Sequence, residues 1–141
     1  MKTKYLIFLL IFLLVGCTSI SINKDSFITK MDSKFENMLT ISEQELSNYY
    51  EIDTKKFKDY IFKVSLESPT NIYVLVLPNN KKEAKKEIEK FFNKKMEISN
   101  KNDQTRIKNK YSNTYGDYLF YIVSDKNKEI YNEMNNFIKN E

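Results

Sequence analysis

Residues 72–77 of this 141-residue chain have the sequence IYVLVL. All six side chains are apolar, and a strand that is apolar on both faces needs cover on both. We therefore predict that this segment is an interior strand of a sheet. The segment before it, residues 60–67, alternates apolar and polar side chains, which predicts a half-buried strand with Lys63 and Ser65 facing outward. The turn Ser68–Asn71 joins the two strands.

A long helix should follow the interior strand, because Pro78–Asn80 breaks the strand and Asn80 is a favourable N-cap residue. Behind this cap, apolar residues recur at intervals of three and four, which is typical of a helix packed on one side. The expected buried side chains are Ala84, Ile88, Phe91, Phe92 and Met96. Residues 99–104, SNKNDQ, are expected to form a loop, and whether residues 105–112 form a strand or a helix stays open.

The C-terminal part predicts a second strand followed by a helix. The turn Tyr115–Asp117 leads into Tyr118–Ser124, which is again apolar on both faces, so we predict a second interior strand. Ser124 or Asp125 then caps a final helix. Its expected inward side chains are Ile130, Tyr131, Met134, Phe137 and Ile138.

Helical spacing also precedes the strands. From Ser26 onward the apolar residues fall on one face of a helix. This stripe consists of Phe27, Ile28, Met31, Phe35, Met38 and Leu39. Ser42 and Glu45 have the spacing of a capping box, so a second, short helix should begin there with Leu46 and Tyr49 facing inward.

Together these elements predict an α+β domain. We expect a small, mostly antiparallel or mixed sheet of three to four strands, with a long helix and a C-terminal helix packed on it and N-terminal helices before it. The doubly apolar strands need cover on both faces, which the N-terminal helices can provide on one face and the two later helices on the other. If the N-terminal helices do not, a tyrosine-rich face of the sheet stays exposed.

The first sixteen residues have the organisation of a bacterial export signal. Lys2 and Lys4 form a short positive region, and Tyr5–Val15 is an unbroken apolar run of eleven residues. A helix needs about 20 apolar residues to cross the hydrocarbon core, so this run is too short for a comfortable permanent span. The positive end stays in the cytoplasm, and we therefore expect the rest of the chain to be exported.

The apolar run ends at Leu14, Val15, Gly16 and Cys17, which resemble the lipobox of bacterial lipoproteins. The resemblance implies that Leu14, Val15 and Gly16 are recognised for cleavage, that residues 1–16 are removed, and that Cys17 carries a diacylglyceryl group. We expect lipid on Cys17 to anchor the protein to the outer face of the cytoplasmic membrane. The alternative is a free cysteine after an ordinary signal peptide, and whether the new amine is acylated stays open.

The mature chain then consists of a short tether and one domain. Residues 17–25 provide the lipidated cysteine and a linker, and residues 26–141 suit a single α+β domain. The seven residues 18–24 reach at most about 25 Å, so the domain should work close to the bilayer. Removing two signal lysines lowers the net charge from +4 to +2, which is not the charge of a nucleic-acid binder.

Four features in order resemble a known family between about residues 46 and 138. They are Tyr50–Asp53 before a short helix, the strand pair around Pro69, the charged helix after Asn80, and Gly116–Tyr118 leading into a strand that ends at Ser124–Asp125. In these features the chain resembles the DUF4358 domain, an uncharacterised domain of Firmicutes lipoproteins. One departure is Lys94–Lys95, where the family carries an arginine. The resemblance implies a localisation and a fold but no catalytic residues.

The composition argues against most catalytic chemistry. The chain has no histidine, which excludes Ser-His-Asp triads and His-ligated zinc, and its two glycines do not suffice for a phosphate-binding loop. Glu83 and Glu87 share a helix face, but adjacent lysines favour ion pairs with Lys86 and Lys90 over acid–base catalysis. We therefore expect no catalytic residue, no metal and no cofactor.

Two groups of side chains are candidates for binding. The lysines between residues 81 and 95 attract anionic headgroups or wall polymers in one interpretation, and form a solvated helix face in the other, which we favour. The aromatic candidates for a surface that stacks on sugars or holds a peptide are Tyr111, Tyr115, Tyr118 and Tyr121. Packing of the sheet is the favoured interpretation of these tyrosines.

The function expected from the sequence is non-catalytic binding of a protein, a peptide or an envelope component by a membrane-anchored lipoprotein. The alternative is a structural accessory subunit of an envelope or sporulation complex, and an enzyme acting on glycan or peptide ranks last. An exposed apolar or tyrosine patch would favour binding. A fully covered sheet would favour the structural role, and a pocket with two facing acids would favour the enzyme.

Overall fold

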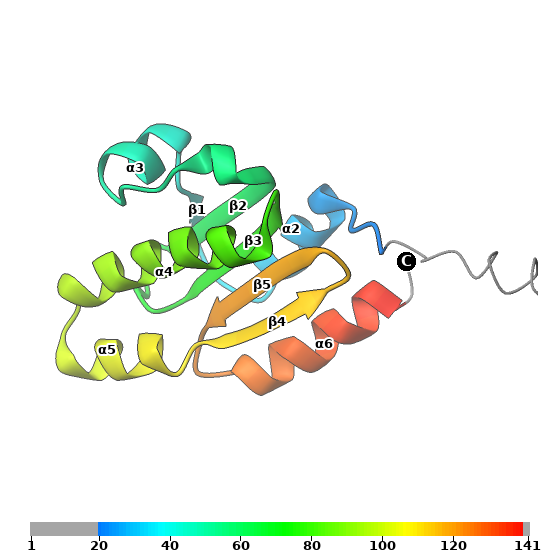
Figure 1. Cartoon of the computed structure of the whole chain (residues 1–141). Helices are drawn as coiled ribbons and strands as arrows, with labels where there is room; N and C mark the ends of the chain where they lie inside the picture. The colour runs from blue at the N-terminus through cyan, green and yellow to red at the C-terminus, as the bar shows by residue number, and fades with distance from the viewer. Residues whose placement is uncertain (1–19, 140–141) are drawn as a thin grey trace, which may run out of the picture.

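The computed structural model describes residues 20–139, in which a five-stranded antiparallel sheet carries helices on both faces (Figure 1). The elements are α2 (Lys24–Asp32), β1 (Met38–Thr40), α3 (Glu43–Asn48), the 3₁₀ helix η1 (Thr54–Lys56), β2 (Phe57–Ser65), β3 (Ile72–Pro78), α4 (Lys81–Glu97), α5 (Lys101–Lys108), β4 (Tyr111–Tyr115), β5 (Tyr118–Val123) and α6 (Asn127–Lys139). The sheet order is β1-β2-β3-β5-β4. The predicted α+β class is confirmed, but the sheet has five strands instead of three to four. Cys17, Leu14, Val15 and Gly16 lie outside the described residues.

Strand β3 lies at the centre of the sheet, as its sequence predicts. It pairs with β2 on one side and with β5 on the other, and Ile72 through Val76 are each at most 2% exposed. Alternate side chains enter opposite cores, because successive residues of a strand point to opposite faces. Val74 thus belongs to one apolar core and Tyr73 to the other.

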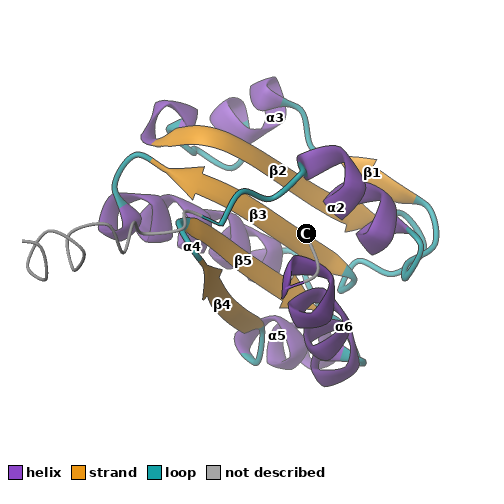
Figure 2. Ribbon diagram, turned by 90° about the vertical axis from the view of Figure 1, so that its right-hand side faces the viewer, coloured by secondary structure: helices purple, strands orange, loops and turns teal. Residues whose placement is uncertain are grey.

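The helices divide between the two faces differently from the prediction (Figure 2). One core contains residues of α3, α4 and α5, and the other contains residues of α2 and α6. The first and the last helix therefore share a face. Phe27 of α2 meets the rings of Tyr73 and Phe120, while Tyr131 of α6 packs on Tyr111 of strand β4. Each of the two helices contributes aromatic cover to a different part of this face.

Helix α2 is shorter than predicted, and β1 is the strand that the sequence pattern missed. The helix begins at Lys24, after the N-cap Asn23, and ends before Ser33, whose N–H and hydroxyl both donate to carbonyls of the last turn. Asn37 then adopts a left-handed φ of 49°, and the next three residues pair with β2. The predicted helical positions of Phe35, Met38 and Leu39 are therefore wrong.

Within the predicted loop 99–104, the residues from Lys101 onward form the first part of helix α5, so most of that loop prediction is wrong. The side chain of Asn100 accepts hydrogen bonds from the N–H groups of Asn102 and Asp103 and begins the helix. The helix runs to Lys108 and β4 starts at Tyr111, which resolves the question left open for residues 105–112. The Asn100 cap, with an acid three residues later, is the signal that identifies this helix.

Strand β2 is buried on both faces over its second half. Lys63 and Ser65 are 6% and 5% exposed, so their predicted outward orientation is wrong. Lys63 pairs with Asp32 at the end of α2, and the Ser65 hydroxyl donates to the Glu36 carbonyl at 2.8 Å. The end of α2 and the segment after it thus cover Lys63 and Ser65. The alternating pattern of β2, taken by itself, predicts that these two side chains face solvent.

The second predicted helix is confirmed as α3. Ser42 and Glu45 form both hydrogen bonds of the capping box, and Leu46 is fully buried. Tyr49, however, is 45% exposed, and the neighbouring Tyr50 occupies the inward position against Phe91 of α4.

Candidate functional site

The four tyrosines singled out from the sequence do not lie on one surface. Tyr111, Tyr115 and Tyr118 pack against the core on the α6 side of the sheet, and Tyr121 packs in the core on the α4 side. Tyr115 and Tyr121 are only 6% and 5% exposed. Burial raises the pKa of each of these two phenols to about 12. Their observed contacts are those of core side chains.

A groove lies instead between α4 and the edge strand β4, on the side of the sheet that α4 covers. It has a volume of about 440 Å³, within the range of ligand-binding clefts. The lining residues are Lys85, Glu89, Lys108, Lys110, Ser112, Asn113, Thr114, Leu119 and Tyr121. Only two of these nine are apolar, so the groove suits a polar or charged partner.

The position of β4 at the edge of the sheet explains why the groove is open. Along β4, Ser112 and Thr114 are exposed, whereas Tyr111 and Tyr115 turn toward α6 on the opposite face. The end of α5 places Lys108 beside the strand. Hydroxyl groups and an ammonium group therefore line the side of β4 that faces α4.

The charge in the groove is positive. Lys110 Nζ lies 3.1 Å from Glu89 Oε2 and 5.1 Å from the centroid of the Phe92 ring, and its side chain is 16% exposed. These contacts hold Lys110 in place. Lys85 and Lys108 are exposed, and none of the ion pairs formed between residues 20 and 139 involves either of them. Three lysines thus face one glutamate.

The backbone of β4 also contributes to the groove. Tyr115 pairs with Tyr118 across a two-residue turn, so the N–H and C=O groups of Ser112 and Thr114 point away from β5. The Thr114 N–H donates to the Asn113 side-chain oxygen at 2.8 Å, which covers the edge at that point. The outward N–H and C=O groups of Ser112 border the lysines and are available to an extended partner.

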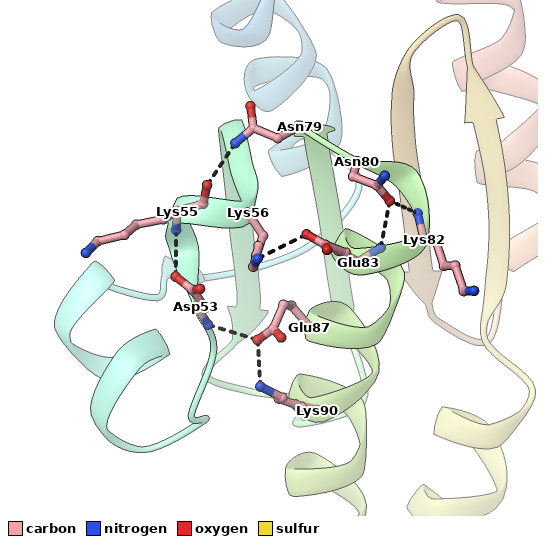
Figure 3. A network of polar contacts seen from close by, with 9 residues as sticks. All are labelled: Asp53, Lys55, Lys56, Asn79, Asn80, Lys82, Glu83, Glu87 and Lys90. Carbon is pink, nitrogen blue, oxygen red and sulfur yellow. Dashed lines mark hydrogen bonds and ion pairs between the residues drawn. The ribbon is translucent and has the colours of Figure 1, made fainter.

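The paired acids Glu83 and Glu87 have structural partners (Figure 3). Glu87 accepts from Lys90 at 2.8 Å, as predicted, and also from the Asp53 N–H at 2.9 Å. Glu83 pairs with Lys56 at 3.0 Å, so the predicted pairing with its helical neighbour is wrong. Both acids fasten α4 to the segment before β2.

The same network fixes the start of α4 (Figure 3). The Asn80 side chain accepts from the N–H groups of Lys82 and Glu83 at 2.9 and 3.1 Å, as a capping residue should. The Asn79 side chain donates to the Lys55 carbonyl at 2.8 Å. The first turn of α4 is therefore held at the beginning of β2, and the two acids Glu83 and Glu87 take part in this junction.

Within residues 20–139, no cluster of three or more Cys, Asp or Glu side chains is placed to hold a metal ion. No helix in this part of the chain is long and apolar enough to cross a membrane.

No family model, curated protein or solved structure matches this chain. The resemblance to DUF4358 therefore stays a prediction. The candidate site is defined by the groove itself, and most of its residues were not singled out from the sequence. A signal was present, because Lys108, Lys110, Ser112 and Thr114 recur at every second position before and along the strand. This spacing places the four side chains on one face only if the segment is a strand, and the sequence left strand or helix open for residues 105–112.

Proposed function

We propose that this chain is an exported lipoprotein, anchored through lipid on Cys17 to the outer face of the cytoplasmic membrane. The support is the order of its N-terminal features: a positive region, an apolar run too short to span comfortably, and the tetrapeptide Leu14–Cys17. Two or more acyl chains hold a protein stably at a bilayer, whereas one alone holds it marginally.

We further propose that the anchored domain is a non-catalytic binding module for an extended acidic segment of an envelope protein. The observation that carries this proposal is the groove beside β4, where Lys85, Lys108 and Lys110 surround the outward backbone of Ser112. An extended peptide is able to hydrogen-bond to such an edge while its carboxylates meet the lysines. The absence of histidine from the sequence and the structural partners of Glu83 weigh against catalysis.

The anchor is tested by replacing Cys17. The Cys17→Ala variant should lose palmitate labelling and should leave the membrane fraction, whereas a Thr18→Ala control should keep both. Continued palmitate labelling of the Cys17→Ala protein would show that the tetrapeptide is not a lipobox.

The groove is tested with a fluorescent peptide of alternating Glu and Val, compared with the same peptide carrying Gln in place of Glu. The Glu peptide should bind more tightly, and added salt should weaken its binding. Replacing Lys85 and Lys108 by Gln should weaken binding about fivefold, because exposed ion pairs contribute modestly. The matched control replaces Lys101 and Lys126, which are equally exposed but lie outside the groove. Equal affinity for the Glu and Gln peptides would contradict the proposal.

A structural accessory role is the second candidate, and one observation favours it. Helices cover both faces of the sheet, and the predicted tyrosine surface is largely buried. Photo-crosslinking in intact cells separates the two functions. A binding module should crosslink through a probe at Thr114 and not through one at Lys128 on α6, whereas a packed subunit should crosslink through both.

A further inference from the structure

The N-terminal segment enters the domain at one defined place. Ile20 lies directly against Gly116 in the turn between β4 and β5, so closely that a Cβ atom on Gly116 would lie 2.9 Å from the Ile20 Cβ. Ile22 is 4% exposed, and Asn23 caps α2. The chain is thus part of the folded domain from about residue 20, and its point of entry is fixed by packing.

This entry point lies at one end of the sheet. The register of the strands brings the start of β2, the end of β3, the end of β4 and the start of β5 to the same end. Figures 1 and 2 show the chain entering beside this end, and Figure 1 shows the last turn of α6 close by. Lys81, at the start of α4, joins the same group, because its ammonium donates to the Gly116 carbonyl at 3.2 Å and lies 3.5 Å from Asp117.

We propose that this end of the domain, defined by the turn at Gly116 and the first residues of β2 and α4, faces an anionic bilayer. The inference rests on the proposed lipidation of Cys17. Two residues separate Cys17 from Ile20, and the three steps of an extended chain between them cover at most about 11 Å. The opposite end of the sheet is farther away by the length of β2, about 27 Å. Ile20 is held against the turn, so the short tether brings this end of the sheet to the membrane surface.

The charges at this end agree with an anionic surface. The lysines there include Lys24, Lys55, Lys56, Lys58, Lys81 and Lys82, and the acids include Asp25, Asp53, Asp59, Glu83 and Asp117. Three of the acids are already paired with lysines of the same group. Lys55, Lys58 and Lys82 are exposed and form no ion pair among the described residues, so their charges are available to lipid headgroups.

This orientation places the groove where a membrane-protein partner could reach it. The groove runs from Thr114, near the membrane end of β4, to Lys108 at the far end of the strand. Its long axis is then directed away from the bilayer and its opening faces sideways. An acidic segment that leaves the same membrane would pass along it.

The orientation is tested on the full chain, produced in a host that processes lipoproteins and reconstituted in vesicles of phosphatidylcholine and phosphatidylglycerol. Because the thioether consumes the Cys17 thiol, an introduced cysteine is the only free thiol and accepts one fluorophore. Labels are placed at Asp117, in the turn, and at Leu66, which is 69% exposed beyond the far end of β2. Lipids with a nitroxide on the headgroup serve as the quencher.

Quenching should be several-fold stronger at Asp117→Cys than at Leu66→Cys. Replacing Lys55, Lys58 and Lys82 by Gln should lower the quenching at position 117 to the value found on vesicles of phosphatidylcholine alone. The matched control replaces Lys101, Lys126 and Lys128 at the other end of the sheet, removes the same charge, and should change nothing.

The possible failures are distinguishable. Equal or reversed quenching in a protein that carries palmitate would overturn the orientation and leave the anchor intact. Absence of palmitate from the wild-type chain would overturn the anchor, and the orientation with it. Equal effects of the two lysine triplets would refute a specific role for the charges at the Gly116 end.

Discussion

The carboxylate of Asp32 connects helix α2 to the centre of the sheet, and its removal should destabilise the domain strongly. Lys63 Nζ pairs with one carboxylate oxygen, and the Tyr73 hydroxyl donates to the other at 2.8 Å. Tyr73 is fully buried and Lys63 is 6% exposed. In Asp32→Ala, a buried ammonium and a buried hydroxyl both lose their partner.

The magnitude follows from the burial of these groups. Breaking a buried ion pair from one side costs about 3–5 kcal/mol, and a buried hydroxyl without a partner costs about 1–3 kcal/mol. The Asp32 side chain is 34% exposed, so water can enter the space that the substitution leaves. Allowing for this water, we expect the free energy of unfolding to fall by about 2–4 kcal/mol in total.

The assay is urea unfolding of the chain from residue 18 onward. The matched control is Asp25→Ala, on the same helix but exposed, which should cost about 0.5 kcal/mol through the lost interaction with the helix dipole. Adding Lys63→Met to Asp32→Ala should recover about 1 kcal/mol, because methionine fills a similar space without a charge. If Asp32→Ala cost no more than Asp25→Ala, or if Lys63→Met made the double variant still less stable, the reasoning would be refuted.

Three further predictions concern other parts of the fold. Gly116→Ala should lower the free energy of unfolding by about 1–3 kcal/mol, because Gly116 has a φ of +56° and its added Cβ would meet Ile20; unchanged urea unfolding would contradict the described packing. Phe91→Ala should cost about 3–5 kcal/mol, since Phe91 is fully buried, and a loss below 1 kcal/mol in the same assay would count against the core. Burial raises the folded-state pKa of Tyr115 and of Tyr121 from 10.0 to about 12. The stability that depends on the neutral phenols is complete below pH 10, and it is lost as the pH rises from 10 to 12, because the unfolded chain ionises first. Each tyrosine contributes a slope of up to about 1.4 kcal/mol per pH unit; Tyr121→Phe should reduce that slope in pH-dependent unfolding, and an identical slope would disprove its role.

The sequence predicted best the elements whose apolar pattern is strong. IYVLVL and the segment from Tyr118 to Ser124 are apolar on both faces, and burial in the middle of a sheet is the only stable place for such strands in water. The cap residues Ser42 and Asn80 predicted helix starts correctly, because capping depends on a few neighbouring atoms. Local chemistry and burial on both faces are properties that a single sequence displays directly.

The parts that were missed depend on partners distant in the chain. Lys63 is buried because Asp32 lies opposite it, and β1 is a strand because β2 offers it an edge; neither partner is visible in the local pattern. The groove beside β4 arises from α4, the end of α5 and the edge strand together. Large amphipathic rings are typical of binding surfaces, which made the four tyrosines candidates. In the sheet, however, Tyr115 and Tyr121 point into different apolar cores.

The partly covered edge of β4 has a consequence under the proposed lipidation of Cys17, which would place many copies on one membrane. Confinement to a surface raises the local concentration of copies, and bare strand edges would then associate into continuous sheets. The Asn113 side chain occupies the Thr114 N–H, and an in-register parallel pairing of two β4 edges would bring Lys108 of one copy toward Lys108 of the other. The occupied donor weakens any pairing of two β4 edges at Thr114, and like charge further opposes the parallel one. An acidic strand beside Ser112 is instead attracted by the lysines.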